Sequence, residues 1–268
     1  MDTHRFGDQG DDIGLLQRRL EKAGCQVAAS HIYDAATEAA VMQLQQKYGL
    51  VVDGIAGPKT LNALAAGRRH PKHLTDADLA WAADVLNVPL AAIRAVNEVE
   101  SRGCGFLPDG RPVILFERHI FWRQLKHHGV DPQPIAQALP DIVSQRPGKY
   151  LGGAAEYMRL ASAEHFHAGA AYESASWGAF QIMGCHWSAL GYSSVDHFVA
   201  CMENSESDQL EAFVRFVTAD AALLAAMRSR RWTQVAKLYN GPNYARHLYD
   251  VKLARAYLRY ADADRVAA

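Results

Sequence analysis

The sequence predicts a mainly α-helical protein of two domains, with one small β element in the larger domain. Apolar residues recur at helical spacing through most of the chain, and a polar, proline-containing stretch near residues 66–75 separates two different patterns. A single short run, "PVILF" at 112–116, is rich in β-forming residues. With 268 residues, of which 49% are hydrophobic, the chain is long enough for two ordinary domains with cores of their own.

Residues 1–65 read as three short helices. The first, "DDIGLLQRRLEKAG" (11–24), places Ile13, Leu16 and Leu20 at helical spacing, and Gly24 stands where a C-terminal cap belongs. The second, "DAATEAAVMQLQQKYGL" (34–50), repeats this scheme and closes at Gly49. The third lies in "DGIAGPKTLNALAAG" (53–67), where Pro58 suits an early helical position.

The second and third helices are preceded by similar turns. "YDAAT" and "DGIAGPKT" each contain an aspartate, a short turn and a threonine, which suggests that one unit was duplicated. The string from Gly7 to residue 65, above all "GLVVDGIAGPKT", resembles the three-helix peptidoglycan-binding domain of cell-wall hydrolases. The resemblance implies a module that holds glycan or stem peptide and performs no chemistry. Its implied binding residues are Asp34, Thr37, Asp53, Gly54, Gly57 and Thr60.

A linker at residues 66–75 leads to the larger domain, residues 76–268. Thr75 or Asp76 can cap the next helix. The stretch "DADLAWAADVLNVPLAAIRAVNEVESRG" (76–103) reads as two helices broken near Asn87–Pro89.

The end of that second helix presents two glutamates. At roughly 100° per residue, Glu100 lies at the margin of the apolar stripe that contains Ile93 and Val96. Glu98 falls on the opposite side, four residues after Arg94, and is expected to be a solvated charge in an i,i+4 pair. A carboxylate facing an apolar surface has a raised pKa, which suits a general acid. A buried carboxylate with a structural partner is the alternative for Glu100.

Three further motifs follow. "GRPVILFERHIFWRQL" (110–125) contains the β-rich run, and "ESASWGAFQIMG" (173–184) is expected to form a helix N-terminus whose serines and glutamine face a cleft. "LYNGPNYARHLYDVKLARAY" (238–257) begins with a tyrosine and an asparagine beside a glycine–proline turn. Each motif taken alone also fits simple core packing.

Together, the order "ES", "SWGAFQIMG" and "YNGP" resembles the lysozyme-like superfamily, notably lytic transglycosylases and goose-type lysozymes. With "GRPVILFERHIF", the chain is most similar to modular phage endolysins, in which a peptidoglycan-binding domain precedes an N-acetylmuramidase domain. The resemblance implies a lysozyme-like, mostly helical catalytic domain. It assigns Glu100 as the catalytic acid and implies a tyrosine hydroxyl that supports it. The implied substrate-binding residues are Ser101, Ser176, Gly178, Gln181, Tyr239 and Asn240.

A hydrolase also needs a carboxylate that activates water. Glu117 in "LFERH" is the first candidate, and Glu173 the second, with substrate binding as its other role. Glu117 can instead pair with Arg118 or Arg123, or orient His119. Ala179–Phe180 departs from the Leu-Met pair usual in transglycosylases, which puts in doubt an anhydro-forming reaction. A lytic transglycosylase would need no second carboxylate, because the substrate's own hydroxyl closes the ring.

Other functional classes leave weaker traces. A formal net charge of −1 argues against a nucleic-acid protein. The histidine-rich "HFHAG" (165–169) raises a metal-dependent amidase, yet no HExxH or zinc-ligand spacing occurs, so neither metal nor cofactor is expected. A cysteine peptidase using Cys104 and His119, and a non-catalytic wall-binding protein, stay as alternatives.

The expected partner is peptidoglycan, and the expected state a monomer. Without an apolar N-terminal segment or a run of about 18 apolar residues, we expect synthesis in a host cytoplasm and no stable membrane insertion. The family resemblance implies release to the wall through a holin.

Overall fold

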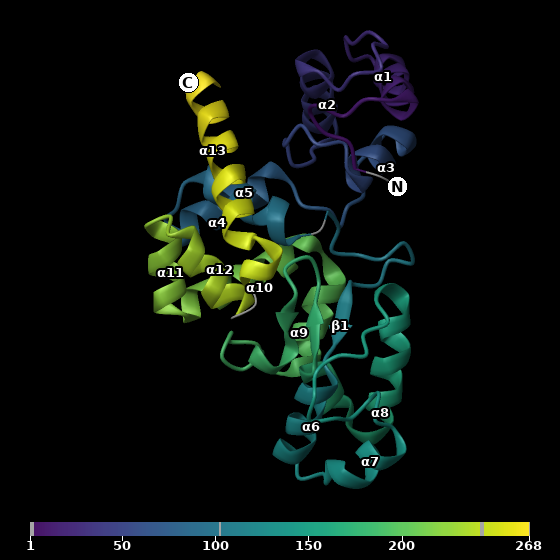
Figure 1. Ribbon diagram of the computed structural model, residues 1–268, viewed down its shortest axis with the longest axis vertical. Coiled ribbons are helices and arrows are strands. Elements are labelled where there is room, and N and C mark those ends of the chain that lie inside the picture. The colour runs from purple at the N-terminus through teal and green to yellow at the C-terminus, as the bar shows by residue number, and fades with distance from the viewer. Residues whose placement is uncertain (1–2, 102, 242–243, 268) are drawn as a thin grey trace. The chain divides into compact units, whose positions relative to one another are not determined.

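The computed structural model describes residues 3–101, 103–241 and 244–267. The chain divides into two compact units, Met1–Glu98 with Ala256–Ala268, and Val99–Arg255. The division falls within helices α5 (Leu90–Glu100) and α13 (Tyr249–Ala267). Figure 1 shows the helices that dominate both units, so the predicted mainly α fold with a small β element is confirmed.

The first unit begins with the three predicted helices, α1 (Asp11–Lys22), α2 (Ala35–Tyr48) and α3 (Pro58–Ala66). Their end signals behave as expected: Pro58 opens α3, and Gly49 takes a left-handed conformation (φ 66°) at the end of α2. The helices and their connecting turns enclose a separate core, formed by Ile13, Leu16, Leu20, Cys25, Tyr33, Ala40, Val41, Leu44 and Ala56.

A buried glutamine on α1 fixes the turn before α2. The Gln17 amide Nε2 donates to the carbonyl of Ile32 at 2.9 Å and to Thr37 Oγ1 at 2.8 Å. Its Oε1 accepts from the backbone N–H of His31 at 2.9 Å. We call this arrangement a glutamine latch, because one side chain forms hydrogen bonds with both a backbone carbonyl and a backbone N–H of the same turn.

A second glutamine latch fixes the turn before α3 in the same way. Gln45 Nε2 donates to the carbonyl of Ile55 and to Thr60 Oγ1, both at 3.1 Å, and Oε1 accepts from the N–H of Gly54 at 3.0 Å. In each latch the threonine stands five residues after the isoleucine and donates to the same carbonyl. The similarity of the two turns, noticed in the sequence, is therefore a repeated hydrogen-bonding unit.

The first unit also contains α4 (Asp76–Leu86) and most of α5. Thr75, one of the two cap residues expected from the sequence, caps α4 and forms a reciprocal capping box with Asp78. Asn87, with φ 51°, ends α4 and separates it from α5. No single helix among the described residues is long and apolar enough to cross a membrane. The bent pair α4 and α5, which meet at 116°, passes that test jointly by length and composition.

The expected role of Glu98 as a solvated charge paired with Arg94 is wrong. Glu98 Oε2 accepts a hydrogen bond from Tyr260 at 2.8 Å and forms an ion pair with Arg259. Arg94 instead lies 3.5 Å from Asp76. Helical spacing identified a possible local pair, but partners on α13, far along the chain, compete more effectively for the carboxylate.

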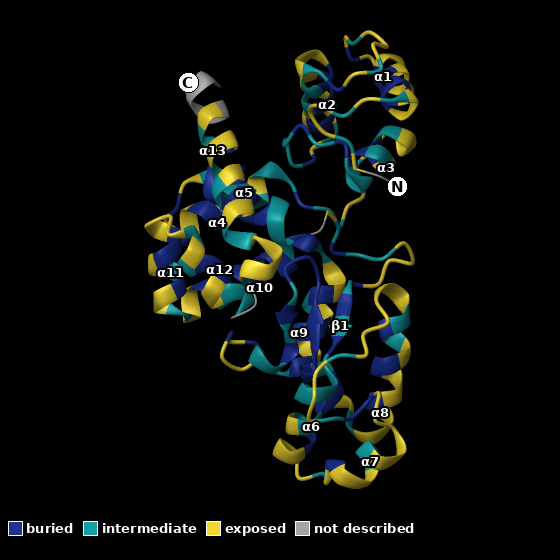
Figure 2. Ribbon diagram, viewed as in Figure 1, coloured by how far each residue is buried: buried dark blue, intermediate teal, exposed yellow. Residues whose placement is uncertain are grey.

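The second unit contains a three-stranded antiparallel sheet in the order β1 (Ile114–Phe116), β2 (Ala175–Trp177), β3 (Ile182–Met183). Its remaining elements are mostly helices, and Figure 2 shows the strands buried among them. They are α6 (Arg118–His127), α7 (Pro132–Ala138), η1 (Gly153–Ala155), α8 (Glu156–Glu173), η2 (Gly184–His186), α9 (Val195–Asn204), α10 (Glu206–Ala219), α11 (Ala221–Arg228), α12 (Trp232–Asn240) and η3 (Tyr244–His247).

The motif at 173–184 does not form the helix N-terminus that the sequence suggested. Its residues form the β2–β3 hairpin, with Ser176 opposite Met183. The connecting turn requires left-handed backbone at Gly178 (φ 73°) and at Gln181 (φ 52°). Glycine adopts this conformation without strain, which explains a tight hairpin turn at Gly178 where the sequence suggested a helix N-terminus.

A buried ion pair anchors the end of β1. Glu156 and Arg159, both on α8, lie 2.8 Å apart. Glu156 Oε2 accepts from the N–H of Phe116 at 3.1 Å, and Arg159 donates to the Phe116 carbonyl at 2.8 Å. Burial favours the neutral form of Glu156, but hydrogen bonds from backbone N–H groups and Arg159 outweigh it and lower its pKa. The strand end that precedes Glu117 is therefore held by a charged pair.

Candidate active site

The site is built around Glu100, the last residue of α5. Asn240, the last residue of α12, donates from Nδ2 to Glu100 Oε1 at 3.0 Å. Both residues are half-buried, and Ser101, the other member of the predicted Glu-Ser pair, is buried. The first and third sequence motifs therefore meet at one carboxylate. Pro242 of the "YNGP" motif lies outside the described residues.

Tyr239 connects this carboxylate to the hairpin. Its hydroxyl donates to the carbonyl of Phe180 at 2.5 Å, so the hydrogen bond expected to support the glutamate is instead supplied by Asn240. The Tyr239 ring packs edge-on against Phe213 at 5.6 Å between centroids. Burial, with the nearby negative charge of Glu100, raises the pKa of Tyr239 well above its usual value, which keeps the hydroxyl a donor.

The hairpin turn is held by two of the predicted substrate-binding residues. Ser176 Oγ donates to Gln181 Oε1 at 2.8 Å, and Gln181 Nε2 donates to the carbonyl of Gly178 at 2.8 Å. A second bond from Gln181 reaches the Val113 carbonyl at 3.3 Å. The side chain of Gln181 thus fixes the turn on which it stands, and it is half-buried rather than fully covered.

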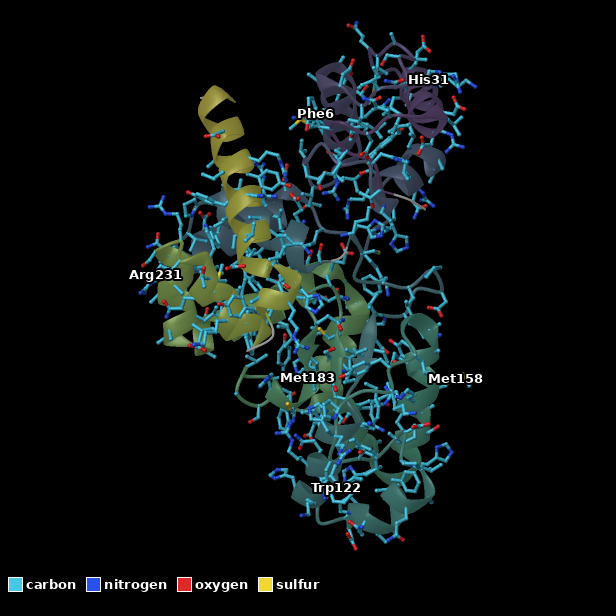
Figure 3. All side chains as sticks on the ribbon, in the orientation of Figure 1. Phe6, His31, Trp122, Met158, Met183 and Arg231 are labelled. Carbon is cyan, nitrogen blue, oxygen red and sulfur yellow. The ribbon has the colours of Figure 1, made fainter. Side chains whose placement is uncertain are left out.

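One face of the sheet is partly open. Leu115 pairs with Ser176, and Ser176 pairs with Met183, so these three side chains share a face. Leu115 and Met183 are half-buried, whereas the opposite face is fully buried. Met183 is labelled in Figure 3. Because side chains alternate along a strand, Glu117, two residues after Leu115, continues the open face.

Glu117 stands at the N-terminus of α6. The Tyr150 hydroxyl donates to its two carboxylate oxygens at 3.0 and 2.9 Å, and His119 Nδ1 lies 3.1 Å from Oε2. Burial and the adjacent Glu117 carboxylate raise the pKa of Tyr150 to about 12. Of the local partners considered from the sequence, His119 is the one that the structure places beside Glu117. Arg118 turns instead to the carbonyls of Pro140 and Pro147.

Glu173, the second candidate, lies in a closed environment. It is 6% exposed. Trp187 Nε1 donates to Oε1 at 2.9 Å, and His128 Nε2 lies 2.8 Å from Oε2. Both oxygens are thus engaged by protein groups, an arrangement typical of a carboxylate that holds neighbouring elements together.

The six predicted wall-binding residues cluster at the two latched turns of the first unit. Asp34 caps α2, Gly57 precedes α3, and Thr37 and Thr60 are buried against the latch glutamines. At Gly54 a Cβ atom would stand 2.8 Å from Glu38 Cγ.

Asp53, the sixth wall-binding residue, accepts hydrogen bonds from Gln45 Nε2 at 2.7 Å and from the N–H of Ile55 at 2.8 Å. Burial raises the pKa of Asp53 to about 6.

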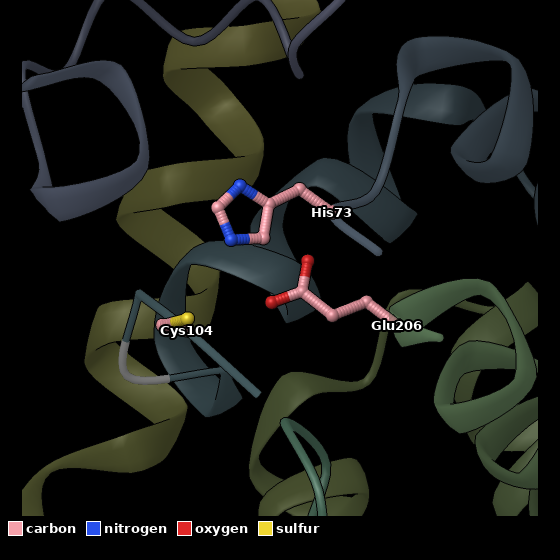
Figure 4. A group of neighbouring side chains, drawn as sticks. All are labelled: His73, Cys104 and Glu206. Atoms are coloured by element: carbon pink, nitrogen blue, oxygen red, sulfur yellow. The ribbon is translucent and has the colours of Figure 1, made fainter. Parts of the chain in front are cut away.

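Two buried polar residues near the site were not found from the sequence. Gln209 and Glu206 on α10 are both fully buried, and Glu206 Oε1 accepts from the N–H of Gly105 at 2.8 Å. Figure 4 shows Glu206 together with Cys104, the residue that precedes Gly105 in the chain. The sequence did contain a sign of their burial. The two polar residues lie one helical turn from each other, within the apolar stripe that continues through Phe213 and Val217.

Comparison with known proteins gives a family match for each of the two parts of the chain. Residues 89–261 match the N-acetylmuramidase family, and residues 9–64 match a putative peptidoglycan-binding domain. The crystal structure of the Burkholderia AP3 phage endolysin superposes with a TM-score of 0.92 at 58% sequence identity, covering 97% of this chain and 100% of that one.

Curated relatives match over the N-terminal part alone. The N-acetylmuramoyl-L-alanine amidase CwlM of Mycobacterium tuberculosis is 41% identical over 64 residues, 23% of this chain and 16% of that protein. The zinc D-Ala-D-Ala carboxypeptidase of Streptomyces albus G is 41% identical over 61 residues, 22% of this chain and 24% of that protein. The chain therefore spans less than a quarter of the length of these relatives.

These matches confirm the resemblance inferred from the motifs, with peptidoglycan as the substrate. The family match covers the carboxylate, the hairpin and the asparagine that the structure brings together. The chain belongs to the N-acetylmuramidase family of glycoside hydrolases, and it carries a peptidoglycan-binding domain ahead of its catalytic domain.

Proposed function

We propose that this protein hydrolyses the β-1,4 bond between N-acetylmuramic acid and N-acetylglucosamine, with Glu100 as the catalytic acid. The observation that carries the proposal is the 3.0 Å hydrogen bond between Asn240 and Glu100. It orients a half-buried carboxyl group at a helix end, where it can protonate the glycosidic oxygen as the bond breaks.

Glu117 is proposed as the base that activates water. Its place at the end of the open sheet face puts it on the same side as Ser176, a predicted groove residue. The Tyr150 hydroxyl fixes its orientation, which a water-activating carboxylate requires. Glu173 is less suited, because it is 6% exposed and engaged at both oxygens.

Mass spectrometry of fragments released from purified peptidoglycan tests the reaction. We expect fragments with reducing-end muramic acid from the wild type, and almost none from Glu100→Gln. Anhydromuramic ends would identify a lytic transglycosylase, a reaction in which Glu100 acts alone and Glu117 has a structural role. Unchanged release by Glu100→Gln would remove Glu100 from the mechanism.

The N-terminal domain is proposed to tether the enzyme to the wall. Tethering raises the local substrate concentration without any new catalytic contact. The matches at residues 9–64 and 89–261 support a domain boundary near residues 66–75. The likeness to a phage endolysin supports a lytic role, in which a monomer made in the host cytoplasm reaches the wall after a holin opens the membrane. Zymography against intact and holin-permeabilised cells tests this route.

A further inference from the structure

The fully buried side chain of Gln209, on α10, forms a junction between two segments of the catalytic unit. Its Oε1 accepts from the N–H of Ala179 in the hairpin turn at 2.7 Å. Its Nε2 donates to the carbonyl of Met202 at 2.8 Å and to that of Gly105, in the segment after Glu100, at 3.5 Å. One amide thus holds the hairpin turn against the segment that follows the catalytic helix.

The Gln209 amide occupies space that is available because two neighbouring residues are glycines without a Cβ atom. A Cβ atom on Gly105 would stand 2.0 Å from Gln209 Oε1, and one on Gly178 would stand 2.5 Å from Gln209 Cδ. Gly178, singled out from the sequence as a substrate-binding residue, therefore has a packing reason to be glycine. Its positive φ of 73° is the second reason.

From Gln209 the contacts lead back to the catalytic carboxylate. Phe180, the residue after Ala179, accepts the hydrogen bond of Tyr239 through its carbonyl. Asn240, the residue after Tyr239, donates to Glu100. The chain from Glu100 to Gly105 then returns to Gln209. Each step is a hydrogen bond or a chain connection of a few residues, so the contacts form a closed ring.

We propose that Gln209 is a positioning residue for the muramidase reaction. Its side chain closes this ring and so holds Asn240 and Tyr239 in their places relative to Glu100. The inference rests on the proposed role of Glu100. Gln209 acts through the hairpin turn, since its side chain forms hydrogen bonds with Ala179, Met202 and Gly105. A buried amide suits the task, because two acceptors and one donor are satisfied by one side chain of fixed length.

The test compares four variants of the full chain, Gln209→Met, Gln209→Glu, Leu210→Ala and Glu100→Gln, with the wild type on short soluble peptidoglycan oligomers. Gln209→Met keeps the length and volume of the side chain but removes every hydrogen bond. Leu210→Ala, the neighbouring fully buried position on α10, is the matched control for lost stability. Glu100→Gln monitors the chemistry itself. Thermal unfolding and circular dichroism set a temperature at which all are folded.

We expect Gln209→Met to lower kcat by about 10- to 100-fold, as misplacement by an ångström does, and KM to change much less. The alkaline limit of its kcat profile should move to higher pH, because a donor that favours the ionised acid is displaced. Gln209→Glu should recover activity at low pH, where the protonated carboxyl can both accept and donate. Leu210→Ala should lower Tm and keep kcat.

Two results would overturn the positioning role while leaving Glu100 in place. One is a folded Gln209→Met variant with wild-type kcat and pH limits beside an inactive Glu100→Gln. The other is an equal loss of kcat in Leu210→Ala, which would mean that any disturbance of α10 has the same effect. If Glu100→Gln were active, the proposed function would fail first, and this outcome is separate from both.

Discussion

Asn240 donates a hydrogen bond to Glu100 at 3.0 Å, although 140 positions separate them in the chain. The amide supplies orientation and no charge. Asn240→Asp would put a second carboxylate beside the first, and two carboxylates that share a site resist ionising together. We expect kcat to fall and the alkaline limb of the pH–rate profile to move to higher pH. The pH dependence of cleavage of soluble oligomers measures both.

Asn204→Asp is the matched control for that substitution. Asn204 is exposed, and its amide donates to Asp208 in the same kind of pair. It should leave the pH–rate profile unchanged. An Asn240→Asp variant with a wild-type profile would mean that the pair does not govern the acid.

Glu98 and Glu100 should separate stability from catalysis. Glu100→Gln should remove most activity with little change in Tm. Glu98→Gln should keep activity and lower the free energy of unfolding by about 1 kcal/mol, because it weakens contacts to Arg259 and Tyr260. Urea unfolding and turbidity clearance of sacculi measure the two effects. Loss of activity in folded Glu98→Gln would contradict this division.

Glu117 should be required for hydrolysis, with Tyr150 supporting it. We expect Glu117→Gln to lower kcat about 100-fold or more, as loss of a general base does. Tyr150→Phe should lower kcat by a smaller factor, because it removes only the hydroxyl that orients the carboxylate and leaves the carboxylate in place. Tyr172→Phe breaks a comparable bond to Glu164 elsewhere in the unit and is the control. Activity of Glu117→Gln equal to wild type would favour the transglycosylase reaction.

The stability of the N-terminal domain should depend on pH through Asp53. Its folded pKa of about 6 lies above that of an unfolded aspartate, so the folded state binds the proton more tightly. The resulting stabilisation is fully present below about pH 4 and is lost as the pH rises to about 6. Asp53→Asn should flatten this dependence, worth about 1–3 kcal/mol, in urea unfolding of the full chain. The pKa of Asp34 is lowered in the folded protein, so Asp34→Asn should change the pH dependence of stability in the opposite direction.

Removing residues 1–65 should affect large substrates most. If this domain acts as a tether, lysis of whole sacculi should fall more than cleavage of short soluble oligomers, because the catalytic contacts are unaltered. Rates on the two substrates, measured with the same preparations, give the comparison. Equal losses on both would remove the tethering role.

The features predicted well from the sequence depend on local chemistry. Caps and breakers at Gly49, Pro58 and Thr75 set helix ends, since each residue acts on backbone groups within a few positions of itself. The two similar turns were visible because each places a threonine near an aspartate. Glu100 was distinguished from Glu98 by its helical face, and the structure places an amide donor beside it.

The features that the sequence could not supply depend on distant partners. Glu98 pairs with residues on α13 that lie more than 160 positions away, so its local spacing to Arg94 misled. The hairpin at 175–183 depends on a left-handed conformation at Gln181, a residue with no intrinsic preference for it. Gln209 gave a signal, a polar residue in an apolar stripe, but its partners in two other segments appear with the fold alone.

The two glutamine latches differ from the catalytic pair in how far apart their partners stand. Gln17 reaches Thr37 across 20 positions, and Gln45 reaches Thr60 across 15. Contacts of such short range form early and quickly, whereas a pairing across 140 positions must await most of the chain. During synthesis the wall-binding helices can therefore assemble while the ribosome is still extending the catalytic segment. The carboxylate gains its amide partner only after residue 240 has emerged, so the lytic centre is completed late in translation.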